Sequence, residues 1–379
     1  MDRLRLAIVL TAASLCFAWA RPVAAQPWDR TTPVRGMTVG PIESALHPGK
    51  GYGSPSCART MAELVRMGAT WVSITPYGRI LDLAPSGIDL TFEAPFEQNR
   101  KAVLAAMRQA HAAGLRVLMV PHLWVESGEW RGEIDPRSDG GWRQWARAYR
   151  QFLLTWAAVA REGRADMFSV GVELGSWLTG RHAPSFFPII ADVRKIYGGP
   201  LTYSANWDDV DNTMILGALD IIGVNAFYPL AEKEGAPFPE LLEGGRRVAE
   251  RVRRLSEEWH KPVIFTELGY TTRRDPAVRP WEWPDRMSQV IVDERAQADA
   301  YHGLLAPLLD EPSFLGFFVW RVYADPDDVS QESEWGFSPR GKLAELVLRD
   351  AYRARWFADG LDPSGDVLTR FRALIPGSY

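Results

Sequence analysis

Two glutamates each follow a short apolar run. Glu267 ends such a run in KPVIFTELGY (261–270), and Glu173 ends another in DMFSVGVELGSW (166–177). Runs this short and apolar are typical of strands buried on both faces, which can hold an ionised side chain only at an end. Two carboxyl groups across one cleft are what glycoside hydrolysis requires: one protonates the leaving oxygen, and the other attacks or activates water. The alternative is a solvated glutamate in a strand-to-loop turn.

The elements that must position these glutamates alternate along the chain. Short apolar runs are followed by loops with glycine or proline and then by amphipathic helical stretches. Eight strands alternating with helices predict an α/β fold, a single (β/α)8 barrel over residues 33–357. A doubly wound sheet is the alternative, but no glycine-rich phosphate loop follows the first strand. The expected strands are 34–40, 69–77, 115–124, 167–172, 201–207, 219–230, 263–267 and 314–323, and the main helices are 56–68, 97–113, 140–162, 185–197, 239–259, 294–310 and 340–356.

Polar and aromatic side chains stand at the ends of most of these strands. A parallel barrel keeps its chemistry at the C-terminal ends of its strands. Flat aromatic rings suit the C–H faces of sugars, and polar side chains bond sugar hydroxyls. We therefore expect a carbohydrate-binding cleft, although barrel filling and loop capping are alternatives for single residues. The expected substrate-binding residues are Tyr77, His122, Trp124, Asn206, Trp207, Asn225, Tyr228 and Trp320.

Other conspicuous side chains have structural explanations. Trp142, Trp145 and Trp156 lie at core spacing on one helical stretch, so we expect them to pack. Asp208, Asp209 and Asp211 are expected to be solvated residues at a helix start, where the helix dipole favours negative charge. The long loop 271–293, with its RPWEWPD segment (279–285), is expected to shape the cleft near Glu267.

The N-terminus resembles a secretory signal. Arg3 and Arg5 precede an apolar run, and small residues predict cleavage after Ala25. We therefore expect a signal peptide over 1–25, export to a periplasm or the medium, and a polar tail over 358–379. Cleavage removes three arginines and one aspartate, so the formal charge moves from −4 to −6, which disfavours nucleic-acid binding. Only Cys57 remains, so no intrachain disulfide is expected.

A metal site is the main rival on a barrel of this kind. Enolase-like barrels bind magnesium through carboxylates of neighbouring strands, whereas here Asn206 and Asn225 stand on the strands between the two glutamates. The six histidines show no zinc-ligand spacing. We expect neither a metal nor a cofactor.

Several segments together resemble the retaining glycosidases built on (β/α)8 barrels, and within them glycoside hydrolase family 113, whose described members are β-1,4-mannanases. The segments are VGVELGSW (170–177), LTYSANWDD (201–209), LDIIGVNAFYPL (219–230), KPVIFTELGY (261–270), PW (280–281) and GFFVW (316–320).

The resemblance implies a role for each of four residues. Glu173 would be the general acid/base and Glu267 the nucleophile. Tyr228 would hydrogen-bond the nucleophile, and Trp320 would floor the subsite of the reacting sugar. Val172 stands where many related enzymes have an asparagine that holds the sugar 2-hydroxyl, so the residue that contacts this hydroxyl is open.

The implied activity is double-displacement hydrolysis of a β-linked polysaccharide or oligosaccharide, with β-1,4-mannan as the first candidate. The alternatives are an enzyme for a β-glucoside or another β-glycan, and a barrel that binds carbohydrate without turnover. The only partner expected is the glycan, with no membrane contact after signal cleavage, and we expect a monomer.

Overall fold

The computed structural model describes residues 28–41, 48–91, 93–283, 289–327, 332–354 and 356. The predicted signal peptide (1–25) and the predicted tail (358–379) lie outside these residues, as do the last two residues of the RPWEWPD segment. The signal peptide and the C-terminal tail therefore stay predictions.

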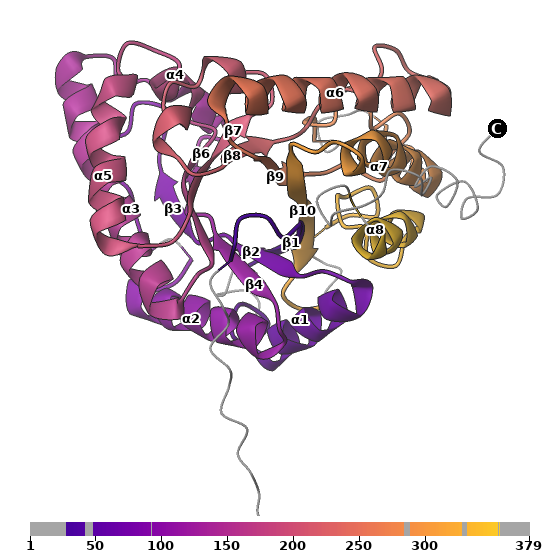
Figure 1. Ribbon diagram of the computed structural model, residues 1–379. Coiled ribbons are helices and arrows are strands. Elements are labelled where there is room, and N and C mark those ends of the chain that lie inside the picture. Colours follow the sequence, from indigo (N-terminus) through magenta and orange to yellow (C-terminus); the bar gives the residue numbers. More distant parts are fainter. Residues whose placement is uncertain are drawn as a thin grey trace, which may run out of the picture.

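Eight parallel strands close into a barrel, as the alternation of apolar runs predicts (Figure 1). Each strand pairs in parallel with both neighbours, so all the C-terminal strand ends meet at one rim. In order around the barrel the strands are β1 (Val34–Gly40), β10 (Phe314–Tyr323), β9 (Val263–Leu268), β8 (Ile222–Asn225), β7 (Leu201–Asn206), β6 (Met167–Val172), β4 (Arg116–Met119) and β2 (Trp71–Ile74).

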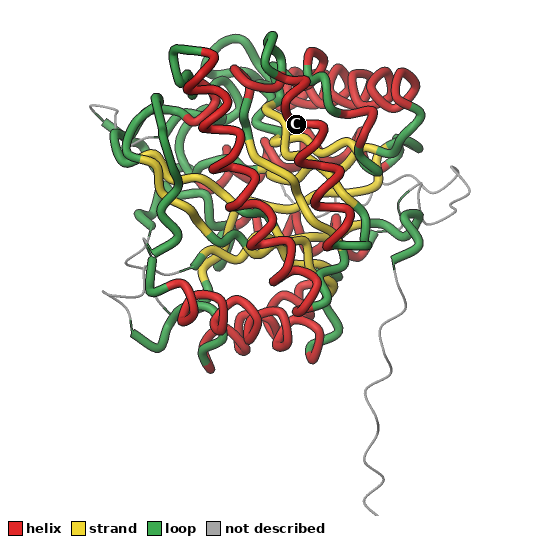
Figure 2. The backbone as a smooth tube through the Cα atoms, turned by 90° about the vertical axis from the view of Figure 1, so that its left-hand side faces the viewer, coloured by secondary structure: helices red, strands yellow, loops and turns green. Residues whose placement is uncertain are grey.

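Helices surround the barrel, and Figure 2 shows them outside the strands. Side-chain caps begin three of them: Ser54, Ser138 and Asp293 each accept a backbone N–H of the first turn. The helices are α1 (Pro55–Met67), α2 (Phe96–Ala112), α3 (Asp139–Gly163), α4 (Gly175–Leu178), α5 (Phe187–Ile196), α6 (Phe238–Trp259), α7 (Glu294–Leu309) and α8 (Leu343–Arg353), with 3-10 turns at η1 (Arg131–Glu133), η2 (Ala183–Phe186), η3 (Val210–Asn212) and η4 (Leu216–Ala218).

Helix α3 shows how the sequence pattern produces the outer layer. Trp142, Trp145 and Trp156 are buried, as their spacing predicts, and Tyr149 and Phe152 lie on the same face. The ring centroids of Trp145 and Tyr149 are 5.6 Å apart. This aromatic face packs α3 against the barrel and gives the helix its stability, since helices of this length depend on tertiary packing.

The interior of the barrel is packed below the rim. Trp71 and Phe318 meet edge to face inside it, and Trp28 meets Trp71 in the same way at a centroid distance of 5.0 Å. Ile264 of β9 belongs to this inner cluster, whereas its neighbour Phe265 belongs to the outer one. The inside is therefore a core, and the C-terminal rim is where functional side chains reach solvent.

Two predicted strands are each divided in the structure. The prediction 69–77 becomes β2 and β3 (Tyr77–Ile80), and the prediction 115–124 becomes β4 and β5 (His122–Val125). Pro76 and Pro121 stand at the two breaks, where the missing N–H interrupts the ladder. β3 and β5 pair with each other in a separate two-stranded sheet.

The predicted strand 219–230 is also too long. Only Ile222–Asn225 pairs as a strand, so Phe227 and Tyr228 lie in the loop that follows.

No helix among the described residues is long and apolar enough to cross a membrane. Within the same residues, no group of three or more His, Cys, Asp or Glu side chains is placed to hold a metal ion. Cys57 is buried and unpaired.

Candidate active site

Glu173 and Glu267 lie at the same rim of the barrel. Glu173 directly follows β6, and Glu267 is the fifth residue of the six-residue strand β9. Both are nearly buried, with exposed fractions of 7% and 6%. The charge of Glu173 helps to raise the pKa of Glu267, so the two carboxyl groups are close enough to interact. The sequence prediction that brings them together is therefore met by the structure.

A shift in strand register precedes each glutamate. On β9, Val224 of β8 faces Phe265 and Asn225 faces Glu267, so one extra residue is inserted before the glutamate. On β6, the register also shifts between Ser169 and Val172. Such irregularities re-aim side chains next to active sites.

The backbone of Glu173 is held in an unusual conformation. Its φ of 49° lies in the left-handed region, which a non-glycine residue seldom adopts without support. The support is local: Glu173 N–H donates to Ser204 O at 2.9 Å, and Leu174 N–H donates to the Tyr203 hydroxyl oxygen at 2.6 Å. Strand β7 therefore fixes the direction in which the Glu173 side chain leaves the rim.

Three side chains contact the Glu173 carboxylate. Asn225 Nδ2 donates to Oε1 at 2.9 Å, and Trp130 Nε1 donates to Oε2 at 3.0 Å. Arg131 lies 3.5 Å from Oε2 and carries a positive charge. Asn225 is itself oriented by Thr266, whose hydroxyl donates to Asn225 Oδ1 at 3.0 Å. Loop residues of η1 and the end of β8 together cover this glutamate.

His122 contacts the Glu267 carboxylate, with Nε2 3.3 Å from Oε1. Burial lowers the pKa of His122 well below its usual value, and the Arg131 charge adds to this effect, so the imidazole is neutral. The Tyr77 ring packs beside His122 at a centroid distance of 4.9 Å, with the ring planes tilted by 37°. The small sheet β3–β5 therefore extends the barrel wall to bring these two side chains to Glu267.

Burial raises the pKa of Glu267 to about 8, and the charge of Glu173 adds to the rise. The charges of Arg131 and Arg321 and hydrogen bonding from Asn225 oppose it. We expected an ionised Glu267 from the role that the resemblance implies. The site instead favours a proton on Glu267 near neutral pH, because a buried carboxylate beside a second one is costly to ionise.

Tyr228 does not make the hydrogen bond to Glu267 that we expected. Its ring packs on Phe265 and Trp207, on the outer side of the barrel, and Arg251 stacks over it. Its hydroxyl is buried and has no hydrogen-bond partner among the described residues. Tyr228 stands in the loop beyond Asn225, where the strand alternation no longer sets the direction of a side chain. The side chain that contacts the Glu267 carboxylate is that of His122.

Aromatic side chains form one wall of the site. Trp320 packs with Phe227 and Phe337, and Trp207 packs against this cluster. Trp207 in turn stacks on Trp281, with centroids 5.2 Å apart and planes at 23°. Trp281 belongs to the RPWEWPD segment and is 45% exposed. Trp281 therefore extends this aromatic wall, and the role of the segment in shaping the cleft near Glu267 stays a prediction.

The remaining expected residues differ in their exposure and contacts. Trp124 lies two residues after His122 on β5, hence on the same face, and is 46% exposed. Asn206 turns aside to donate to the exposed Asp208 at 2.7 Å. Trp320 is joined to Arg321 by a cis peptide bond, and the Arg321 guanidinium lies 4.8 Å from the Trp320 ring centroid.

Three residues of the site were not expected from the sequence. Trp130 and Arg131 lie in an irregular loop with no periodic pattern to mark them. Asp209, which we expected to be solvated, has both carboxylate oxygens buried.

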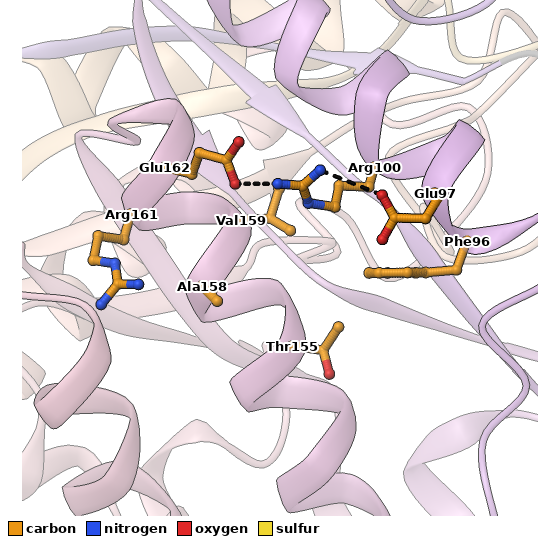
Figure 3. Close-up of a pocket in the computed structure, with 8 residues that line it drawn as sticks. All are labelled: Phe96, Glu97, Arg100, Thr155, Ala158, Val159, Arg161 and Glu162. Carbon is orange, nitrogen blue, oxygen red and sulfur yellow. Dashed lines mark hydrogen bonds and ion pairs between the residues drawn. The ribbon is translucent and has the colours of Figure 1, made fainter.

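One surface groove lies away from these residues. It encloses about 500 Å³ between α2 and α3, and Figure 3 shows Arg100 reaching from α2 between Glu97 and Glu162. Both carboxylates pair with this guanidinium. The groove holds no residue from a strand end, so it is separate from the site described above.

Comparison with known proteins agrees with the barrel fold. The structure superposes on the family 113 β-mannanase AaManA from Alicyclobacillus acidocaldarius, in complex with ManMIm, with a TM-score of 0.72 and 26% identity, covering 85% of this chain and 97% of that one. A second solved structure, a family 113 β-1,4-mannanase, gives 0.72 and 22%, with 86% and 100% covered. A family 5 mannosidase from Rhizomucor miehei shares the fold at a TM-score of 0.58 and 12% identity, with 90% and 95% covered.

No curated protein matches the chain in sequence. The model of the family described as Glycoside Hydrolase Family 113 matches residues 45–342. Since this match spans far more than half of the residues and contains every strand from β2 to β10, the chain belongs to glycoside hydrolase family 113.

Proposed function

We propose that this glycoside hydrolase cleaves β-1,4-linked mannan or manno-oligosaccharides by double displacement. Glu267 is the nucleophile and Glu173 the general acid/base. One observation carries the proposal: two buried glutamates stand at the same rim of the barrel, and each is held by its own polar partners. The solved family 113 mannanases support the choice of sugar.

In the first step, Glu267 attacks the anomeric carbon while Glu173 gives its proton to the leaving oxygen. This step requires an ionised Glu267, whereas burial favours a proton on Glu267. In the transition state, the positive charge that develops at the anomeric carbon beside Glu267 stabilises the Glu267 carboxylate. Arg131 and Arg321 act in the same direction.

In the second step, Glu173 takes a proton from water, which attacks the glycosyl–enzyme ester and releases Glu267. The Glu267 charge has disappeared at this stage, so Glu173 can act as a base. Asn225 and Trp130 hold both Glu173 oxygens in place for the two roles. Asn225 also offers a contact to the sugar 2-hydroxyl, because it ends β8, one of the two strands between those of the two glutamates, and it touches Glu173.

The experiment assays a panel of β-mannan, β-glucan and other β-glycans for released reducing ends. NMR then identifies which anomer of the product forms first. We expect release from mannan and the β-anomer as first product. Release from glucan alone would mean that the substrate is a β-glucan and not mannan. An α-anomer as the first product would mean that the enzyme inverts the anomeric centre in a single displacement. Binding without release would indicate a barrel that binds carbohydrate only.

The variants Glu173→Gln and Glu267→Gln test the residues. General acid/base catalysis contributes about 10²–10⁴-fold, so Glu173→Gln should lose that much on mannotriose, and Glu267→Gln at least as much. Glu257→Gln on α6, whose side chain is 69% exposed, is the matched control. Export by residues 1–25, to a periplasm or the medium, is part of the proposal and is tested by N-terminal sequencing of the mature protein.

A further inference from the structure

Trp130 touches the Glu173 carboxylate and still presents much of its ring to solvent. Its Nε1 donates to Glu173 Oε2 at 3.0 Å, yet Trp130 is 39% exposed. Asn225, which donates to the other oxygen of the same carboxylate, is fully buried. An exposed aromatic ring with its polar edge fixed at a buried glutamate is an apolar surface that a ligand can cover.

The Trp130 ring lies on the backbone of its own loop. A Cβ built on Gly132 would lie 2.4, 2.5 and 2.6 Å from Cη2, Cζ2 and Cζ3, three consecutive atoms of the six-membered ring. Because these distances are nearly equal, the Cβ position lies over the face of the ring and not beyond its edge. Gly132 is buried, so one face of the indole is covered by backbone that carries no side chain. The exposure of Trp130 therefore belongs to the opposite face and the free edge.

The loop that carries this ring is fixed relative to Glu173. The Ser176 hydroxyl, three residues after Glu173, donates to the backbone oxygen of Ile134 at 2.6 Å. Arg131, the residue after Trp130, brings its guanidinium within 3.5 Å of Glu173 Oε2. A guanidinium carries only hydrogen-bond donors, which suit the hydroxyl oxygens of a sugar. An apolar ring face and a set of donors therefore stand together at one oxygen of Glu173.

The chemistry of Glu173 indicates what would cover the ring. A general acid must reach the glycosidic oxygen that leaves, so the sugar on the leaving side lies next to it. The Trp130 ring is bonded directly to the same carboxylate and so lies where that sugar must pass. A flat apolar face with a polar edge suits the C–H face of a pyranose ring.

We propose that Trp130 forms the binding site for the leaving sugar: its N–H holds Glu173 while its free face stacks on the neutral pyranose unit that departs. This rests on the proposed function, because it needs Glu173 as the acid/base. The same site receives an acceptor sugar when a sugar hydroxyl opens the glycosyl–enzyme in place of water, since that step is the reverse of the first. The acceptor oxygen then bonds to the anomeric carbon, the bond to Glu267 breaks with its electron pair, and the acceptor proton passes to Glu173.

The test measures how the glycosyl–enzyme divides between water and a sugar acceptor. β-Mannobiosyl fluoride forms the glycosyl–enzyme with a leaving group too small to reach an aromatic ring, and added mannobiose then competes with water. The transfer ratio is the initial rate of mannotetraose formation divided by the initial rate of fluoride release, at mannobiose concentrations below saturation. Water and acceptor both need Glu173 as the base, so a change in Glu173 itself cancels in this ratio.

Two variants separate the ring from its N–H. Trp130→Ala should lower the transfer ratio about 3–10-fold, the range of one aromatic stacking contact. Trp130→Phe loses the donor to Glu173 and keeps a ring. It should therefore slow fluoride release and keep the transfer ratio close to that of wild type.

A third variant moves the ring without changing Trp130. Gly132→Ala places a methyl group where the ring lies, so the transfer ratio should fall towards that of Trp130→Ala. Gly140→Ala on α3 is the matched control, because the nearest atom to its Cβ would be 3.8 Å away. Phe187→Ala on α5, an aromatic residue exposed to a similar degree at 40%, is the second control. Both should keep the wild-type ratio, and thermal unfolding of every variant checks its fold.

A wild-type transfer ratio in Trp130→Ala would overturn the proposal, since a structural role alone lowers both rates and leaves their ratio unchanged. A wild-type enzyme that transfers only to water at every mannobiose concentration would overturn it too. An equal fall in Trp130→Phe and Trp130→Ala would do the same, because the N–H and not the ring would then hold the acceptor. If wild type consumes no mannobiosyl fluoride and cleaves no mannan, the proposed function fails. The ratio measured with the disaccharide fluoride of the glycan that is cleaved then decides the role of Trp130.

Discussion

His122 Nε2 lies 3.3 Å from Glu267 Oε1, and the imidazole is neutral because burial lowers its pKa. A neutral imidazole can donate one proton to a carboxylate without adding charge. The other ring nitrogen, Nδ1, is buried and makes no hydrogen bond among the described residues. The contact therefore orients Glu267 and favours its charged form.

The first prediction concerns this contact. His122→Phe removes the donor, and kcat on mannotriose should fall about 10–100-fold, because a hydrogen bond to a charged group contributes about 1.5–3 kcal/mol. His122→Gln keeps a donor on a shorter side chain and should recover part of the loss. Equal activity of His122→Phe and wild type would show that the contact does not serve the reaction.

The second prediction assigns the two glutamates by chemical rescue with azide. In Glu267→Ala, azide attacks the anomeric carbon in place of the missing nucleophile, so the product from an activated β-mannoside should be the α-mannosyl azide. In Glu173→Ala, the glycosyl–enzyme still forms and azide opens it, so the β-mannosyl azide should appear. NMR of the two products distinguishes the anomers. If Glu267→Ala gave the β-mannosyl azide and Glu173→Ala the α-mannosyl azide, Glu173 would be the nucleophile and Glu267 the acid/base.

The sequence predicts the barrel and the glutamate pair because both depend on strong local patterns. Each glutamate ends an apolar run, and parallel strands bring their C-terminal ends to one rim, so the two had to meet. The same logic places Asn225 at the end of β8, whereas His122 reaches Glu267 from the separate sheet β3–β5. It cannot predict the register shifts before Glu173 and Glu267, which depend on the neighbouring strands.

The errors lie where the strand pattern ends. Tyr228 comes three residues after the last residue of β8, where alternation no longer sets the direction of a side chain. Asp209 stands in a run of acidic residues that is typical of a solvated turn, but the tertiary fold covers its carboxylate with Gly175. Trp130 and Arg131 stand in a loop without periodicity, and only the packing of that loop over Glu173 reveals them.

The third prediction concerns stability and pH. The pKa of Glu267 is raised to about 8 in the folded protein, against an ordinary value of 4.5. Between these values the folded state binds more protons than the unfolded state, so this residue lowers the free energy of unfolding as the pH rises. Glu267→Gln cannot ionise and should lose that dependence.

Thermal unfolding at pH 5 and pH 8 measures the effect. Glu267→Gln should unfold near wild type at pH 5 and at a higher temperature than wild type at pH 8. The exposed control Glu257→Gln should follow wild type at both values. A difference between Glu267→Gln and wild type that is the same at both pH values would contradict the raised pKa.

The fourth prediction concerns the aromatic wall. Trp281 stacks on Trp207 and is 45% exposed, so it offers a free face to a sugar beyond the reacting one. Trp281→Ala should lower kcat/KM on mannohexaose about 3–10-fold, since an aromatic stacking contact contributes about 0.5–1.5 kcal/mol. Mannotriose is shorter and should be affected less, because fewer of its sugars reach past Trp207. Leu346→Ala on α8, an apolar side chain exposed to a similar degree at 48%, is the control and should change neither substrate. An equal loss on both substrates in Trp281→Ala would mean that Trp281 supports the loop or the reacting subsite, and the wall would then end at Trp207.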